Sequence, residues 1–313
     1  MRRNSTVEYS KRKSAPTRQA FTLIELMIVI VVIATLMGLL LPAVQSAYRR
    51  VKIAQVVTEI KGLESAIAQF KAVYGIEPPS RIRLYELGTG GVSWASDPGN
   101  EPERARSIAI MNRFCPGFNF DFLPGRDFNG DGSLGGVTVL TGAECLVLFL
   151  GGGHVTSPDG SYAMLGFSKN PTDPFLGAGG NESREGPFFE FKTSQLRKSP
   201  NANNPNALVY VDPSSGQLAP YVYASSYDGR GYQTGDLAVL PAPNALNLTD
   251  VYRSSGAPSY VALKPKSCQI ISPGTDGLYG SGGYFSPTAA NHGLSAKADY
   301  DNITNFHGSL LNE

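Results

Sequence analysis

The sequence is short of cysteine and of charge, and each shortage excludes a class of protein. Three cysteines in 313 residues are too few for a disulfide framework, and the spacing of Cys115, Cys145 and Cys268 fits no metal motif. They allow either one disulfide with one thiol left over or three buried thiols that pack as small apolar side chains. Charged residues make up only 17% of the chain and the net charge is +1, so nucleic-acid binding through bulk electrostatics is not expected.

Recognisable motifs of catalysis are also missing. The three histidines, His154, His292 and His307, are scattered and show no H-E-x-x-H spacing. The sequence contains neither a G-x-S-x-G elbow nor a P-loop, and its glycine clusters at 88–91, 151–153 and 280–283 lack the strand-to-helix context of a phosphate cradle. The sequence therefore predicts a protein that is not an enzyme.

What the sequence does contain is one long apolar run. From Phe21 to Leu41 nearly every residue is apolar, and Glu25 is the only charged one. About 20 residues at ~1.5 Å rise per residue match a hydrocarbon core of ~30 Å. The stretch before the run holds one acid, Glu8, among several cations: Arg2, Arg3, Lys11, Arg12, Lys13 and Arg18. Because such cations mark the cytoplasmic flank of a membrane segment, the rest of the chain is expected on the opposite side.

Glu25 separates the possible interpretations of this run. A cleaved secretory signal has a shorter apolar region followed by a small-residue cleavage site, and this run has neither. An ordinary signal anchor fits in length, but an acidic residue in a membrane helix costs roughly 2.5–3.5 kcal/mol at the centre and less near an end. A cut just before Phe21 would create an amine one helical turn from Glu25. That amine would offset the cost, within one chain or between neighbouring chains that are staggered.

The residues A-F-T-L-I-E-L-M-I-V-I-V-V-I, 20–33, resemble the class III signal of type IV pilins and type II secretion pseudopilins. The resemblance implies a prepilin peptidase that cuts between Ala20 and Phe21, removes residues 1–20 as a leader and methylates the new N-terminus at Phe21. It makes Glu25 the assembly glutamate of the family and Pro42 its helix-kinking proline. The family usually has glycine before the cut, where this chain has Ala20.

The same resemblance implies a structural role. It predicts a subunit of a type II secretion pseudopilus, with a cytoplasmic N-terminus, a single span of the inner membrane at about 21–41, and a periplasmic domain that later joins a filament. Its partners would be further copies and other pseudopilins, the prepilin peptidase, the inner-membrane assembly platform, and membrane lipid before assembly. Two alternatives remain open: a type IV pilus subunit for adhesion, motility or DNA uptake, and a membrane-anchored binding domain that borrows the leader.

After Pro42 the helical period continues and becomes amphipathic. Apolar residues recur every three or four positions from Val44 to Phe70, charged residues mostly occupy the other faces, and Gly75 with the following prolines ends the pattern. One helix is therefore expected from about Phe21 to Tyr74, on the order of 80 Å long at ~1.5 Å per residue. Because no heptad is sustained, its second half is expected to pack on a sheet rather than in a coiled coil.

Residues 75–313 are predicted to form a β-rich domain. A Gly/Pro-rich stretch covers about 75–136, and Thr141 with Glu144 forms a capping box for a short helix at 142–150 that buries Cys145. Runs of β-branched and aromatic residues predict strands at 188–192, 207–211, 221–225 and 268–272. Since no linker between them demands a parallel crossover, we expect an antiparallel sheet packed on the first helix. The fold class is therefore α+β, and the resemblance implies a pilin-like form with inserts at 75–136 and 151–185.

One loop carries oxygen ligands in a pattern that suits calcium. In D-F-N-G-D-G the residues Asp127, Asn129 and Asp131 alternate, and Gly132 follows them, as in the first half of an EF-hand loop. Thr138 stands at the twelfth position, where the EF-hand has a bidentate glutamate. The alternative is an acidic turn without a metal ion.

A second calcium candidate lies near the C-terminus. The segments I-S-P-G-T-D-G-L-Y-G-S-G-G and D-Y-D-N-I-T-N-F resemble the calcium loop of major pseudopilins. The resemblance places the ligands at Asp276, Asp301 and Asn302. This chain departs from the family pattern by an insertion between the two segments and by Asn302 at a position where an acid is more usual. The alternative is a Gly-rich tail that binds no ion.

Overall fold

The computed structural model describes residues 21–86, 92–121, 128, 136–177, 183–201, 204, 206–213, 219–237, 250–255 and 261–312. They belong to two compact units, which divide between Arg49 and Arg50. The predicted leader, with Ala20, and the loop residues Asp127, Asn129 and Asp131 lie outside the described residues.

One helix, α1 (Leu23–Tyr74), begins in the first unit and ends in the second. It continues through Pro42, as predicted, and ends where Gly75 takes a φ of +71° and donates its N–H to the Lys71 carbonyl at 2.8 Å. A positive φ costs glycine little, so Gly75 is a natural helix stop. Both ends of α1 lie within about two residues of the predicted limits.

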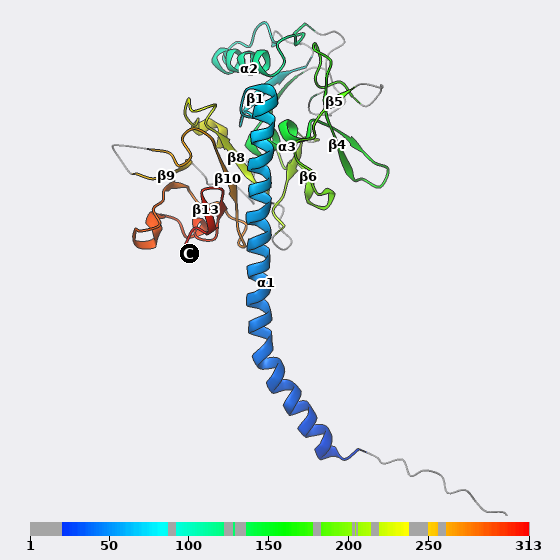
Figure 1. Ribbon diagram of the computed structural model, residues 1–313, viewed down its shortest axis with the longest axis vertical. Helices are drawn as coiled ribbons and strands as arrows, with labels where there is room; N and C mark the ends of the chain where they lie inside the picture. The colour runs from blue at the N-terminus through cyan, green and yellow to red at the C-terminus, as the bar shows by residue number, and fades with distance from the viewer. Residues whose placement is uncertain are drawn as a thin grey trace, which may run out of the picture. The chain divides into compact units, whose positions relative to one another are not determined.

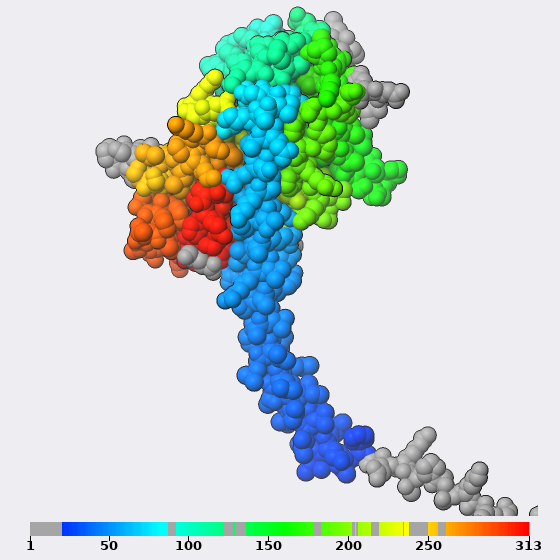
Figure 2. Space-filling model, in the orientation of Figure 1, coloured from blue at the N-terminus to red at the C-terminus, as the bar shows by residue number. Residues whose placement is uncertain are grey.

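The second unit is built around the C-terminal half of α1. In Figure 1 this part of α1 has β8 (Val222–Ser225), β10 (Cys268–Ser272) and β13 (His307–Leu310) on one side. On the other side are α3 (Gly142–Gly151) and β6 (Leu196–Lys198), and Figure 2 shows the helix in a groove between the two flanks. The buried residues of α1 recur every three or four positions: Val56, Glu59, Ile60, Leu63, Ala66, Ile67 and Phe70. Each large apolar side chain buried in this way contributes roughly 1.5–3 kcal/mol.

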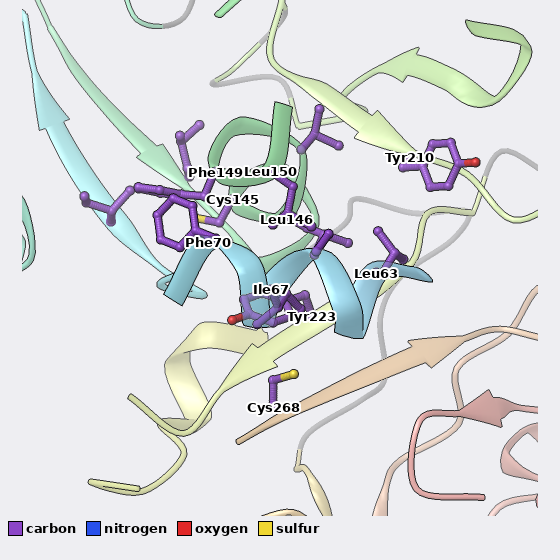
Figure 3. Packing of buried hydrophobic residues seen from close by; sticks show 14 of the residues in the cluster. Leu63, Ile67, Phe70, Cys145, Leu146, Phe149, Leu150, Tyr210, Tyr223 and Cys268 are labelled. Atoms are coloured by element: carbon purple, nitrogen blue, oxygen red, sulfur yellow. The ribbon is translucent and has the colours of Figure 1, made fainter. Parts of the chain in front are cut away.

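The short helix α3 (Gly142–Gly151) forms the other wall of this core. Its predicted capping box is present, because the Thr141 N–H and hydroxyl both donate to Glu144 Oε2, at 2.8 and 3.2 Å. Figure 3 shows Cys145, Leu146, Phe149 and Leu150 of α3 turned towards Phe70 and its neighbours on α1. All but one of the residues of α3 are buried, in agreement with the prediction of a buried helix.

The described strands form several small antiparallel sheets and one parallel pair. The sheet that lies against α1 has the order β13-β12-β10-β8. In it β8 pairs with β10 so that Ala224 faces Gln269. Its strands are β8 (Val222–Ser225), β10 (Cys268–Ser272), β12 (Ile303–Thr304) and β13 (His307–Leu310). The strands predicted at 221–225 and 268–272 are thus confirmed.

The remaining ladders surround this centre. β1 (Ile82–Tyr85) pairs with β2 (Val137–Leu140), and β6 (Leu196–Lys198) pairs with β7 (Leu208–Tyr210), which confirms the strand predicted at 207–211. A third ladder joins β3 (Gly153–Thr156), β4 (Tyr162–Ser168) and β5 (Arg184–Glu185). The parallel pair is β9 (Tyr252–Arg253) with β11 (Gly283–Tyr284). Single 3-10 turns lie at Thr193–Gln195, Thr234–Leu237, Ala290–Gly293 and Lys297–Asp299.

Two parts of the prediction were wrong. The stretch 75–136 contains regular structure, namely β1 and the helix α2 (Glu101–Phe114), where only Gly/Pro-rich loop was expected. Residues 188–192 form no strand, because the backbone N–H groups of Phe188 and Phe189 donate to the Leu150 carbonyl at the end of α3, at 2.8 and 3.4 Å. Their aromatic side chains still pack against the core. The apolar pattern therefore predicted the packing of these side chains correctly, and the prediction that their backbone pairs in a sheet was wrong.

Candidate functional site

The start of α1 is held by a reciprocal pair of side chains. The Thr22 N–H and hydroxyl donate to Glu25 Oε2 at 2.9 and 2.8 Å, and the Glu25 N–H donates to the Thr22 hydroxyl at 3.2 Å. These bonds satisfy N–H groups that a helix start leaves without partners. No described residue donates to the second oxygen, Oε1, so one half of the carboxylate remains available.

This arrangement gives Glu25 a local role that the sequence reasoning missed. The pattern Thr-x-x-Glu before an apolar run is itself the signal for a capping box, and it was visible at Thr22-Leu23-Ile24-Glu25. Phe21 precedes the helix, and its side chain is 85% exposed. An amine at Phe21 would therefore stand outside the first turn of α1, beside the carboxylate.

The helix after this cap can cross a membrane by its length and composition. Its apolar side chains between Leu23 and Leu41 are largely exposed within the described residues, so no protein core accounts for them. Exposed apolar surface on this scale calls for lipid or for other chains around it. One helix of this kind is present in the described part of the chain.

Comparison with known families identifies this segment. A model of the prokaryotic N-terminal methylation motif matches residues 16–41. Residues 16–41 are a class III prepilin signal. The signal is that of the type IV pilin and pseudopilin family, and it supports a pilin-like subunit that is processed by a prepilin peptidase and assembles with other pilin-type subunits. No curated protein and no solved structure matches the chain.

The C-terminal loop brings two of the three predicted ligands together. Asp301 Oδ2 accepts the backbone N–H groups of Thr275 and Asp276 at 2.6 and 2.9 Å, and the Thr275 hydroxyl at 2.7 Å. Burial raises the pKa of Asp276, and the neighbouring Asp301 carboxylate raises it further. A cation bound beside Asp276 would favour its charged form.

Asn302, the third predicted ligand, is directed to different partners. Its Nδ2 donates to the Tyr252 hydroxyl at 2.9 Å and to the Tyr279 carbonyl at 2.8 Å, and its buried Oδ1 has no partner among the described residues. The sequence reasoning also missed Asp299, which is fully buried in the same network. Its carboxylate accepts the Tyr252 hydroxyl at 2.6 Å and the Gly282 N–H at 3.0 Å, so it holds the glycine-rich loop in place.

Of the other calcium candidate, the loop with Asp127, Asn129 and Asp131, the structure describes only Phe128 and the residues from 136 onward. Thr138, at the twelfth position, lies in β2 and donates its hydroxyl to Glu86 Oε1 at 3.0 Å. The Phe128 N–H donates to the same oxygen at 3.2 Å. Within the described residues, no cluster of three or more histidine, cysteine, aspartate or glutamate side chains could hold a metal ion.

Proposed function

We propose that this protein is a pseudopilin, a structural subunit of the periplasmic filament of a type II secretion system. The observation that carries the proposal is the prepilin signal at residues 16–41 joined to a helix that caps itself through Thr22 and Glu25. The resemblance of the loop around Asp276 and Asp301 to the calcium loop of major pseudopilins favours the secretion branch over surface pili. The role is assembly, without catalysis.

In this proposal the geometry at Glu25 separates two tasks. Oε2 accepts hydrogen bonds from Thr22 and keeps the first turn of α1 formed. Oε1 is left to accept the methylated amine of Phe21 from a neighbouring subunit once the helix leaves the bilayer. A charged hydrogen bond in an apolar surrounding is strong and directional, so it would set the stagger between adjacent subunits.

A matched pair of variants tests this division. In Glu25→Gln the amide oxygen can still accept from Thr22, but the charge is lost, so we expect normal processing and loss of filaments. In Thr22→Val the charge remains and only the cap is weakened, by about 1 kcal/mol, so filaments should still form. Filament yield is measured by shearing and immunoblotting, and mass spectrometry of the mature subunit should find a methylated Phe21. Filaments of Glu25→Gln at the wild-type level, an intact leader, or a cut beyond residue 41 would contradict the proposal.

Two other functions predict different phenotypes. Deletion of a pseudopilin should stop the export of a secreted hydrolase, whereas deletion of a type IV pilus subunit should abolish adhesion, twitching or DNA uptake. A membrane-anchored binding domain should keep its function in the Glu25→Gln variant, because its activity does not depend on subunit stagger.

We further propose that the C-terminal loop binds Ca²⁺ through Asp276 and Asp301, with Asn302 as a third ligand. Calcium prefers carboxylate and carbonyl oxygens and takes six to eight of them, so backbone carbonyls and water would complete the shell. The pairing of these carboxylates supports the site. A bound ion would cancel their repulsion and tie the segment at 275–276 to the segment at 301. The Nδ2 of Asn302 is engaged with Tyr252 and Tyr279, whereas its Oδ1, the atom that could bind a cation, accepts no hydrogen bond from a described residue, so Asn302 stays in the proposed ligand set through Oδ1.

A further inference from the structure

A hollow of about 260 Å³ lies beside the C-terminal end of α1, outside both sites described above. Its lining combines the guanidinium groups of Arg106, Arg113 and Arg230 with the apolar side chains of Ile76 and Ile110. We propose that it is a binding site for a carboxylate carried on a small apolar or aromatic group.

The acidic side chains around this hollow already accept hydrogen bonds from the protein. Glu77 accepts from Lys71 at Oε1, at 3.4 Å, and from Ser225 at Oε2, at 3.2 Å. Asp228 is bonded to Lys71 at 2.9 Å and to Arg113 at 3.1 Å. Both oxygens of the third acid, Asp236, likewise accept hydrogen bonds. None of these acids is left to neutralise a further cation.

The guanidinium groups, in contrast, have donors to spare. A guanidinium carries five N–H donors, and the described bonds of Arg106 and Arg113 use only Nη2 of each. Arg106 also lies over the Tyr227 ring, with its Cζ 4.2 Å from the centroid. Arg230 is exposed and forms no hydrogen bond or ion pair with any described residue. Within the described residues, the hollow therefore offers more guanidinium donors than there are acceptors bonded to them.

The charge balance selects a monoanion. The charged side chains that line the hollow are three guanidinium groups and the carboxylates of Glu77 and Asp228, which leaves one positive charge uncompensated. One carboxylate neutralises that excess, whereas a doubly charged phosphate would exceed it. The planar fork of arginine matches the two oxygens of a carboxylate, and the floor of Ile76 and Ile110 suits an apolar group attached to it.

The backbone beside the hollow is held in an unusual conformation. Tyr227 and Asp228 have φ values of 52° and 60°, in the left-handed region that side chains with a Cβ seldom adopt. Both side chains are fixed by the charges described above, because Tyr227 donates to Asp236 and Asp228 pairs with Lys71 and Arg113. The loop that carries Arg230 is thus preorganised, which lowers the cost of binding.

The test uses the full chain in detergent micelles and titrates it with benzoate, with its neutral analogue benzamide, and with inorganic phosphate, by calorimetry. We expect benzoate to bind and benzamide not to. Arg230→Gln should weaken benzoate binding on the order of tenfold, the effect of losing one charge-assisted hydrogen bond. The matched control is Arg197→Gln, an exposed arginine whose described bond goes to the Leu196 carbonyl, and it should bind benzoate like the wild type.

A second arm separates the two sources of such a carboxylate. A short peptide that ends in phenylalanine with a free carboxylate is compared with benzoate and with its own C-terminal amide. Tighter binding of the free peptide assigns the hollow to a protein terminus, and equal binding of benzoate assigns it to a small molecule. The proposal is overturned if benzoate does not bind at millimolar concentrations, if benzamide or phosphate binds as well as benzoate, or if Arg230→Gln has no effect.

Discussion

At the scale of single residues, α1 carries two carboxylates in unusual settings, and hydrogen-bond donors that lie beside them in space stabilise both. Glu25 lies in the apolar segment and is held by Thr22. Glu59 lies in the buried stripe, only 7% exposed, and accepts from Lys192 at 2.5 Å and Tyr221 at 2.8 Å. A buried carboxylate without such donors would cost several kcal/mol. Glu59 therefore fastens α1 to the domain, although its charge suggested a solvent-facing position.

Asp97 gives a pH-dependent prediction at the same scale. Burial raises the pKa of Asp97, but hydrogen bonds from Tyr85, Asn100 and Arg83 outweigh burial and hold it below the ordinary 3.8. A carboxyl with a lowered pKa stabilises the fold fully above its unfolded pKa, and that stability is lost as the pH falls through the folded pKa. Asp97→Asn should therefore be about 1–2 kcal/mol less stable at neutral pH, with the difference shrinking below pH 3.8.

Urea unfolding of the two proteins at several pH values checks this prediction. The exposed Asp121→Asn variant, matched in its chemical change, should follow the wild type throughout. A stability difference between Asp97→Asn and the wild type that stays constant into the acid range would contradict the role assigned to the charge.

At the scale of elements, the contact between α3 and β8 depends on a missing side chain. A Cβ on Gly142 would stand 1.9 Å from the Tyr223 carbonyl oxygen, and backbone cannot yield as a flexible side chain can. Gly142→Ala should therefore push α3 away from β8 and destabilise the fold by about 3 kcal/mol or more. Thermal unfolding measures the loss. Gly177→Ala is the control, because a Cβ there meets no atom within 4 Å and should change little.

The elements that could be predicted from sequence are those whose signals are local. α1 has a helical apolar pattern that continues over many turns and a glycine that ends it, and α3 has its capping box. The limits of both helices were therefore predicted within about two residues. α2 was missed because its signals, a proline and acids in the first turn and buried Met111 and Phe114, lie within a stretch rich in glycine and proline. The backbone partner of 188–192 could not be predicted, since it is a carbonyl some 40 residues away, that of Leu150.

The site shows the same division between local and distant signals. The prepilin signal is a contiguous motif, and it was read correctly from Phe21, Glu25 and their neighbours. The partners of Asn302 lie on separate segments of the chain, at Tyr252 and Tyr279, so the sequence could not predict the hydrogen bonds of its amide N–H groups. No periodicity or spacing in a single sequence predicts hydrogen bonds between residues so far apart in the chain.

At the scale of the whole molecule, calcium would couple the C-terminal loop to overall stability. A ligand that binds only the folded state raises the melting temperature, so a calcium chelator should lower the melting temperature of the wild type by a few degrees. Asp276→Asn should start at the lower value and no longer respond to the chelator. The matched variant Asp159→Asn, in an exposed turn, should respond as the wild type does. A full response in Asp276→Asn would place any bound ion elsewhere.

The three cysteines described above have a consequence for the chemistry of the folded chain. All are buried and none forms a disulfide: Cys115 lies at the end of α2, Cys145 in α3 and Cys268 in β10. Burial raises the pKa of Cys268 to about 12 and raises that of Cys145 well above the ordinary value, so neither is a reactive thiolate at neutral pH. Within the described residues no disulfide cross-links the fold, so reducing conditions remove no cross-link there. Each sulfur becomes chemically accessible only when its own segment opens. The rate at which a thiol reagent modifies each cysteine would therefore report the local unfolding of that segment.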